Sequence, residues 1–226
     1  MKRFCLTLCL LAGLTRNGFA ASADQPAVVE LFTSQGCSSC PPANANLRAL
    51  ADRPDVLALS FSVTYWDHLG WKDTFARLEF TQRQYDYEKP LGEDGPFTPQ
   101  IVVDGDSDTV GNDRHAIEKL IAASHRDHAP MILLADDAVH IGVAPKRSAQ
   151  VWLVRYDPRL QEIPIGAGEN SGVTLPHRNV VRALTLLGMW DGAARDFPLP
   201  KADAGLKTAV LLQARRGGPI LAVARN

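Results

Sequence analysis

The chain has 226 residues, of which 46% are hydrophobic and 22% are charged. This is an average globular composition, which excludes disordered, collagen-like and coiled-coil chains and allows one or two domains with a hydrophobic core. A formal net charge of −1 gives no indication of a nucleic-acid partner or of a polybasic membrane surface. After the N-terminus, no apolar run reaches the roughly 18 residues that a membrane span needs.

The first 23 residues have the pattern of a secretory signal peptide. Lys2 and Arg3 are followed by an apolar segment at residues 4–14 and by small residues that fit cleavage after Ala20 or Ala23. The alternative is a buried N-terminal helix. The order of basic, apolar and small residues favours the signal, so we expect export, to a bacterial periplasm, and no membrane insertion after cleavage.

Export leaves a single pair of cysteines. Cys5 and Cys9 belong to the predicted signal, so the mature chain keeps Cys37 and Cys40 in a CxxC motif. A lone CxxC in an oxidising compartment is the most informative feature of the sequence.

The order of predicted elements separates an α/β half, residues 24–129, from a mostly β half, residues 130–226. The first half alternates apolar β-branched runs with helical periodicities. Its elements are a strand at 27–32, a helix after the CxxC, a strand at 56–63, a helix at 71–88, a hairpin at 100–110 and a last helix capped by Asn112 or Asp113. Acidic residues predominate in this half and basic residues in the second, which also favours two domains.

The second half is predicted to be an antiparallel β-sandwich or a partial barrel. Its strand-like runs are separated by Gly, Pro, Asn and Asp, and its helical periodicity is weak. The runs lie at 151–154, 180–187, 209–213 and 220–223, and the segment 180–190 also fits a helix.

The CxxC follows a buried strand and precedes a helix. Free backbone N–H groups and the positive end of the helix dipole favour the thiolate at the first sulfur, so Cys37 is the expected attacking thiol and Cys40 the resolving one. Because a proline ring clashes with the carbonyl four residues earlier, Pro41 and Pro42 predict that the regular helix begins near Pro41.

A structural disulfide, a metal site of zinc or copper, and a non-catalytic binding module stay open as other interpretations of the CxxC. A structural disulfide across so short a loop stabilises by only ~2 kcal/mol in the chain-entropy relation. A zinc site usually needs four ligands, and there is no second CxxC. Cu(I) bound by Cys37 and Cys40 is the stronger metal alternative, with His68, His115 or His177 as a third ligand. The last is a non-catalytic binding module.

Two further segments are expected near the cysteines. Thr98-Pro99 precedes a predicted strand, and in thioredoxin-like folds a cis-proline at that position lies opposite the CxxC and holds a substrate backbone. The segment 65–73 follows the second strand, so it reaches the same sheet edge as the CxxC. Trp66, Trp71 and Asp67 are therefore candidates to line a substrate groove, although the tryptophans also suit packing of the helical insertion.

The run Val28-Val29-Glu30-Leu31-Phe32-Thr33-Ser34-Gln35-Gly36-Cys37-Ser38-Ser39-Cys40-Pro41-Pro42-Ala43 resembles the signature of a bacterial secreted family, domain of unknown function 1223. Residues 65–73, 98–100, 168–170, 179–182 and 218–221 resemble its pattern too. The resemblance spans nearly the whole mature chain. It implies a thioredoxin-like fold with a C-terminal β extension, and it implies no known activity.

The chain departs from well-understood thioredoxins near the strand before the CxxC. Thioredoxins carry a buried acid six residues before the first cysteine, where this chain has Leu31. Glu30 lies one residue earlier, and a step of one residue moves a side chain to the other face of a strand. Glu30 is thus either a proton relay for the cysteines or a carboxylate with another partner. The Gly168-Glu169-Asn170 segment is expected to be a loop, and no chemistry is assigned to it.

The sequence therefore predicts an exported thioredoxin-like thiol–disulfide oxidoreductase without a cofactor. Cys37, Cys40 and Glu30 are the candidate catalytic residues, and Thr98, Pro99, Trp66 and Asp67 are the candidate substrate-binding residues. The expected partners are protein or small-molecule thiols and disulfides. The alternatives are a periplasmic Cu(I)-binding protein and a non-catalytic binding module.

Overall fold

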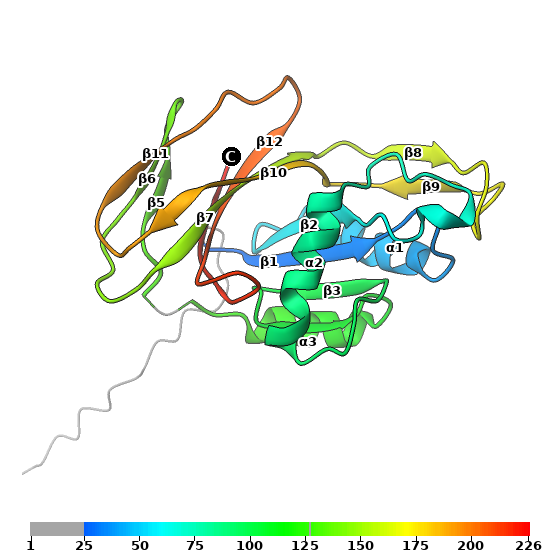
Figure 1. The fold of residues 1–226 in the computed structure, drawn as a ribbon, viewed down its shortest axis with the longest axis horizontal. Coiled ribbons are helices and arrows are strands. Elements are labelled where there is room, and N and C mark those ends of the chain that lie inside the picture. The colour runs from blue at the N-terminus through cyan, green and yellow to red at the C-terminus, as the bar shows by residue number, and fades with distance from the viewer. Residues whose placement is uncertain (1–24, 127) are drawn as a thin grey trace, which may run out of the picture.

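A mixed eight-stranded sheet organises the chain in the computed structural model (Figure 1), which describes residues 25–126 and 128–226. The predicted signal peptide lies outside these residues. In the first half, β1 is parallel to β2 and antiparallel to β3, which pairs with β4. The elements of this half are β1 (Ala27–Thr33), α1 (Cys40–Leu50), β2 (Val56–Ser62), η1 (Asp67–Leu69), α2 (Leu78–Leu91), β3 (Gln100–Val103), β4 (Ser107–Val110) and α3 (Arg114–Ala123).

Local sequence accounts for most of these elements. All seven residues of β1 and of β2 are buried, as their continuous apolar runs predict for strands covered on both faces. Asp104 and Gly105 both have positive φ, 54° and 65°, as the two central residues of a type I′ turn do, and with Asp106 they connect β3 to β4. The Asp113 carboxylate accepts a hydrogen bond from the Ala116 N–H and caps α3, which confirms one of the two predicted caps.

The helix predicted at residues 71–88 is only partly correct, because α2 begins at Leu78. Upstream, aspartate side chains take the place of helical hydrogen bonds. The Asp73 N–H donates to Asp67 and the Phe75 N–H donates to Asp73. Arg77 is extended, with φ −141° and ψ 147°. The helical periodicity of the sequence therefore begins before the helix does, because local side-chain bonds keep residues 71–77 out of a regular helix.

The second half is rich in β-strands, as predicted, and the segment 180–190 is a strand rather than a helix. Three antiparallel pairs extend the main sheet to the order β13-β12-β7-β10-β2-β1-β3-β4, with β10 meeting β2 at Val180 and Ser60. The division into two domains stays a prediction. The strands are β5 (Ile132–Leu134), β6 (Ala138–Ile141), β7 (Ala149–Asp157), β8 (Gln161–Pro164), β9 (Thr174–His177), β10 (Val180–Trp190), β11 (Arg195–Pro198), β12 (Lys207–Gln213) and β13 (Ile220–Arg225).

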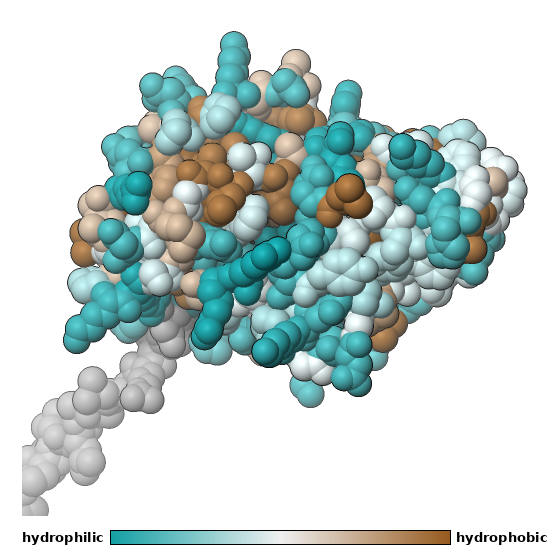
Figure 2. Space-filling model, viewed as in Figure 1, coloured by the Kyte–Doolittle hydropathy of each residue, from teal (hydrophilic) through white to brown (hydrophobic). Residues whose placement is uncertain are grey.

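The two faces of the main sheet have different covers. On one face, α2 packs over aromatic side chains such as Phe32, Phe61 and Phe80. On the other, α1 and α3 cover β1 and β3, while the three-stranded sheet β11-β6-β5 covers β7, β12 and β13. Beside α2, a pocket of about 280 Å³ lies against Trp152, Leu184 and Leu186, where Figure 2 shows apolar side chains gathered on the surface.

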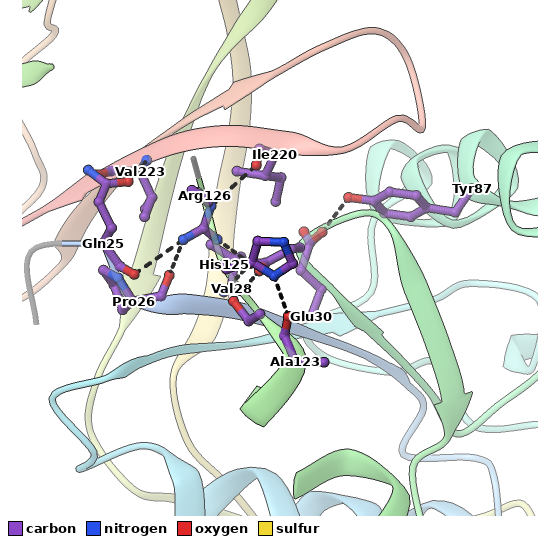
Figure 3. Close-up of polar contacts among 12 residues, drawn as sticks. Gln25, Pro26, Val28, Glu30, Tyr87, Ala123, His125, Arg126, Ile220 and Val223 are labelled. Atoms are coloured by element: carbon purple, nitrogen blue, oxygen red, sulfur yellow. Dashed lines mark hydrogen bonds and ion pairs between the residues drawn. The ribbon is translucent and has the colours of Figure 1, made fainter. Parts of the chain in front are cut away.

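A buried charge cluster joins the two ends of the described chain (Figure 3). Arg126, after α3, pairs with Asp104 and donates to the carbonyl oxygens of Pro26 and Ile220. Asp104 also accepts from the Val28 N–H at 2.8 Å. These bonds fix the start of β1, the β3–β4 turn and the start of β13 to one another. Within the described residues, no helix is both long enough and apolar enough to cross a membrane.

Candidate functional site

The CxxC lies at the carboxyl end of β1, where the chain turns into α1. Cys37 occupies the turn and Cys40 is the first residue of the helix, with Pro41 and Pro42 in its first turn. The Cys40 N–H donates to the Cys37 carbonyl at 3.1 Å, which closes a tight turn before the regular helix, as predicted. The two sulfurs are at disulfide distance, and the Cα atoms are 5.4 Å apart.

The loop before β3 approaches Cys37 directly. The Thr98 hydroxyl donates to Cys37 Sγ at 3.3 Å, and the Thr98 carbonyl oxygen lies 3.9 Å from the same sulfur. The Thr98-Pro99 peptide bond is cis. Pro99 is held against the loop after β4, because its carbonyl oxygen accepts from the Gly111 N–H at 2.8 Å. The structure thus brings Thr98 and Pro99 to the CxxC, two sequence-derived candidates that lie about 60 residues away along the chain.

Of the candidates after β2, Trp66 bonds Thr98 beside the cysteines, whereas the bond of Asp67 lies within its own loop. The Trp66 Nε1–H donates to the Thr98 hydroxyl at 2.8 Å, and the Trp66 side chain lies over Gly36. The Asp67 carboxylate instead accepts the N–H of Asp73 and shapes the 67–73 loop. Trp71 donates from Nε1 to the Gln35 side-chain carbonyl at 2.9 Å, so it holds the segment that leads into the CxxC.

Glu30 is placed away from the cysteines. Its neighbours Val29 and Leu31 pack with α1, whereas Val28 and Phe32 pack with α2, so the alternation of β1 directs Glu30 to the α2 face. There its carboxylate accepts from Arg83 Nε at 2.6 Å and from the Tyr87 hydroxyl at 2.5 Å. Figure 3 draws the bond between Tyr87 and Glu30. Of the two interpretations of Glu30, the geometry favours a carboxylate with another partner, because the side chain leaves the strand on the face opposite α1.

Asp73 also belongs to the site, although the sequence singled out only the segment 65–73 that contains it. It is 3% exposed, and its carboxylate accepts the Gln35 N–H at 2.8 Å and the Phe75 N–H at 2.8 Å. Burial raises the pKa of Asp73 above its ordinary value, and these hydrogen bonds oppose the shift. Gln35 in turn bonds Thr74, so the segment before Cys37 is fixed from the 71–75 loop.

The loop between β8 and β9 covers the CxxC from the other side. The Asn170 side-chain amide donates to the carbonyl oxygens of Gln35 and Cys37 at 2.9 and 2.8 Å. The Glu169 carboxylate accepts the Ser38 N–H at 3.0 Å and the Ser38 hydroxyl at 2.7 Å. These Ser38 hydrogen bonds hold the pKa of Glu169 below its usual value, so the side chain is charged at neutral pH. A loop was predicted at residues 168–170 without any assigned chemistry. Its hydrogen bonds show that it holds the CxxC segment in place.

The histidines considered as copper ligands are dispersed. His68 is exposed, with Nδ1 2.8 Å from the Tyr65 carbonyl oxygen, and His115 is exposed on α3. His177 is buried on β9 against Phe75, and burial lowers its pKa to about 4. In residues 25–126 and 128–226, no group of three or more His, Cys, Asp or Glu side chains could hold a metal ion. Copper binding therefore stays a prediction that rests on the cysteines alone.

A family model described as "Protein of unknown function (DUF1223)" matches residues 28–213. The chain belongs to this family. No curated protein matches the sequence significantly. Among solved structures, this DUF1223 chain is similar to protein AGR_C_4864 from Agrobacterium tumefaciens, with 32% identity and a TM-score of 0.73 over 92% of this chain and 95% of that one. It is also similar in fold to HBP35 of Porphyromonas gingivalis, with 12% identity and a TM-score of 0.58 over 92% and 76% of the two chains.

The site of this DUF1223 protein is therefore built from four separate segments. They are the CxxC turn, the 66–75 loop, the Thr98-Pro99 loop and the β8–β9 loop. The first three follow or precede strands that the hydrophobic pattern identifies. The fourth comes from a two-stranded sheet, β8-β9, that is separate from the main sheet, and its only sequence signal is the Gly-Glu-Asn-Ser-Gly run at 168–172.

Proposed function

We propose that Cys37 and Cys40 carry out thiol–disulfide exchange on a thioredoxin-like domain. The observation that carries the proposal is the approach of Thr98 to Cys37, with a hydroxyl donor 3.3 Å from Sγ and a carbonyl oxygen 3.9 Å from it. A hydroxyl that donates to sulfur stabilises the thiolate, and the main chain beside it is suited to align an extended partner segment.

The arrangement of the first half supports the thioredoxin-like interpretation. The element order β1-α1-β2-α2-β3-β4-α3, the sheet order β2-β1-β3-β4 and a CxxC between β1 and α1 are those expected of that fold. The loop with Thr98 and Pro99 precedes β3 and faces the CxxC, as the sequence pattern predicted for a substrate-binding loop.

In the proposed reaction, the Cys37 thiolate of the reduced protein attacks one sulfur of a partner disulfide. The partner S–S bond breaks, a mixed disulfide forms, and the departing partner thiolate takes up a proton. The Cys40 thiolate then attacks Cys37 Sγ, which forms the Cys37–Cys40 disulfide and releases the second partner thiol. Two electrons pass from the cysteine pair to the partner, and the reverse sequence oxidises a partner dithiol.

The proposed partners are protein or small-molecule thiols and disulfides in a bacterial periplasm. The location rests on the signal-peptide pattern at residues 1–23. In that compartment the protein would either oxidise dithiols or reduce disulfides. The direction of electron flow follows from the reduction potential of the Cys37–Cys40 couple relative to that of its partner.

The test is a trapping experiment with purified protein and insulin as the disulfide probe. Cys40→Ala should accumulate a mixed disulfide with insulin on non-reducing electrophoresis, because the resolving thiol is missing, while Cys37→Ala should accumulate none. Pro99→Ala should slow insulin reduction by dithiothreitol, and His115→Ala, an exposed α3 variant, should match the wild type. Equal trapping by both cysteine variants, or trapping by neither, contradicts the exchange mechanism.

A further inference from the structure

The sulfurs of the CxxC are closed off from solvent although the motif lies at the surface. Cys37 and Cys40 are each 0% exposed, while Ser38 and Ser39 between them are exposed. Disulfide exchange requires a thiolate to reach a sulfur and displace its neighbour, so a fully covered disulfide cannot react until a covering group moves.

The β8–β9 loop lies against the backbone of the CxxC segment, and the contact is made by specific hydrogen bonds. Asn170 is 6% exposed and donates from one side-chain nitrogen to the carbonyl oxygens of residues 35 and 37. The Glu169 carboxylate accepts hydrogen bonds from both the N–H and the hydroxyl of Ser38. A partner chain bound at Cys37 therefore competes with Glu169 for the Ser38 N–H.

The loop backbone fits closely against the site. A Cβ added to Gly168, whose φ is +77°, would lie 3.5 Å from the Trp71 Cβ and 3.9 Å from the Gly36 Cα. A Cβ on Gly166 would meet the Trp71 ring at 3.0 Å. The loop is closed on itself by bonds between Ile165 and both Gly172 and Val173, so it is built to move as one unit on the β8–β9 hairpin.

The β8–β9 hairpin lies outside the main sheet, unlike the strands that carry the other segments around Cys37. Thr98 and Trp66, on the opposite side of Cys37, extend from β3 and β2 of the main sheet. Among the described residues, β8 and β9 form a two-stranded sheet of their own. Side-chain contacts hold this hairpin to the rest of the chain, among them the bond from Arg48 to the Pro176 carbonyl oxygen and the bond from Arg182 to Gln161. Opening on this side therefore leaves the strand pairing of the main sheet in place.

We propose that residues 166–172 form a latch over the CxxC, with Asn170 as the positioning residue that holds it closed. This inference rests on the proposed thiol–disulfide exchange and adds a regulatory step to it. In the closed state the Cys37–Cys40 disulfide is protected, and exchange proceeds only when the latch leaves Gln35, Cys37 and Ser38. A partner gains access by displacing Glu169 and Asn170, not by binding a preformed open cleft.

The test measures how fast dithiothreitol reduces the disulfide in the full protein, followed by stopped-flow fluorescence. Asn170→Ala should be reduced about tenfold faster than the wild type, because two buried hydrogen bonds that close the latch are lost. Glu169→Ala should be a few-fold faster, since its bonds to Ser38 are exposed. Ser171→Ala is the matched control in the same loop and should keep the wild-type rate, because the Ser171 hydroxyl donates to the Gly166 carbonyl at 3.4 Å, within the loop itself.

The reduction potential and the thermal midpoint separate a latch from a general loss of structure. Both should stay close to the wild-type values in Glu169→Ala, since a latch changes access to the sulfurs and not the stability of the fold. Wild-type reduction rates in both Asn170→Ala and Glu169→Ala overturn the inference. If Asn170→Ala does not fold, the exposed Glu169→Ala decides alone. Faster reduction without any trapping of insulin by Cys40→Ala leaves the latch standing and refutes the exchange function.

Discussion

Replacing Glu30 alone is predicted to destabilise the protein much more than replacing Glu30 and Arg83 together. The two side chains are 0% and 4% exposed and share two hydrogen bonds, of 2.6 and 3.1 Å. Glu30→Gln keeps the shape but removes the negative charge. Arg83 is then a buried cation whose remaining partners are Gln213 and the Tyr87 hydroxyl, and it lies over the rings of Phe61, Tyr87 and Trp152.

The size of the effect follows from the cost of an uncompensated buried charge. Breaking a buried ion pair by removal of one partner costs ~3–5 kcal/mol, and the neutral partners of Arg83 place Glu30→Gln near the lower figure. In Glu30→Leu/Arg83→Met no charge is left to desolvate, and Gln213 keeps its bond to the Tyr87 hydroxyl at 3.1 Å. The double variant should therefore lie within ~1 kcal/mol of the wild type.

Urea unfolding of the wild type, of Glu30→Gln and of Glu30→Leu/Arg83→Met measures these differences. A Glu30→Gln variant within ~1 kcal/mol of the wild type, or a double variant as unstable as Glu30→Gln, refutes the reasoning. The same variants test the relay hypothesis for Glu30. Because its side chain is on the α2 face, folded Glu30→Gln should exchange disulfides with the pH profile of the wild type. A shifted pH profile would restore Glu30 as a relay.

Three further predictions concern other parts of the chain. Mass spectrometry of exported protein should show cleavage after Ala20 or Ala23, and an intact Met1 would contradict the signal peptide. Because burial lowers the pKa of His177 to about 4, the unfolded state binds a proton first as the pH falls below ~6.5, so His177 lowers the free energy of unfolding by ~3 kcal/mol between pH 6.5 and 4. His177→Leu should remove that part of the pH dependence in urea titrations. Asp113→Ala should cost ~1 kcal/mol through the lost α3 cap, and an unchanged urea midpoint would contradict it.

The predictions from sequence succeeded where local pattern and local chemistry agree. Continuous apolar runs located β1 and β2, Asp104-Gly105 located the hairpin turn, and Pro41-Pro42 located the start of regular helix after the CxxC. Each of these signals acts within a few residues, because it depends on backbone sterics, on side-chain alternation or on a missing N–H.

The helix boundary that was predicted wrongly has a different cause. The helix predicted from residue 71 begins at Leu78, because the side chains of Asp67 and Asp73 take up backbone N–H groups that a helix would use otherwise. The alternation of β1 places Glu30 on the face opposite the cysteine-bearing helix. Only the fold shows that Arg83 and Tyr87 of α2 lie on the same face as Glu30 and bond its carboxylate.

The sequence alone determined that a CxxC stands between a buried strand and a helix, because the motif and its neighbours are contiguous. Only the tertiary structure decided what surrounds it. Thr98 meets the Cys37 sulfur, Asp73 bonds the segment that leads to it, and Asn170 donates to the Cys37 carbonyl oxygen from a hairpin more than 130 residues later. Those contacts depend on how separate strands and loops are brought to one edge of a sheet, and long-range packing of this kind leaves no periodic signal in the sequence.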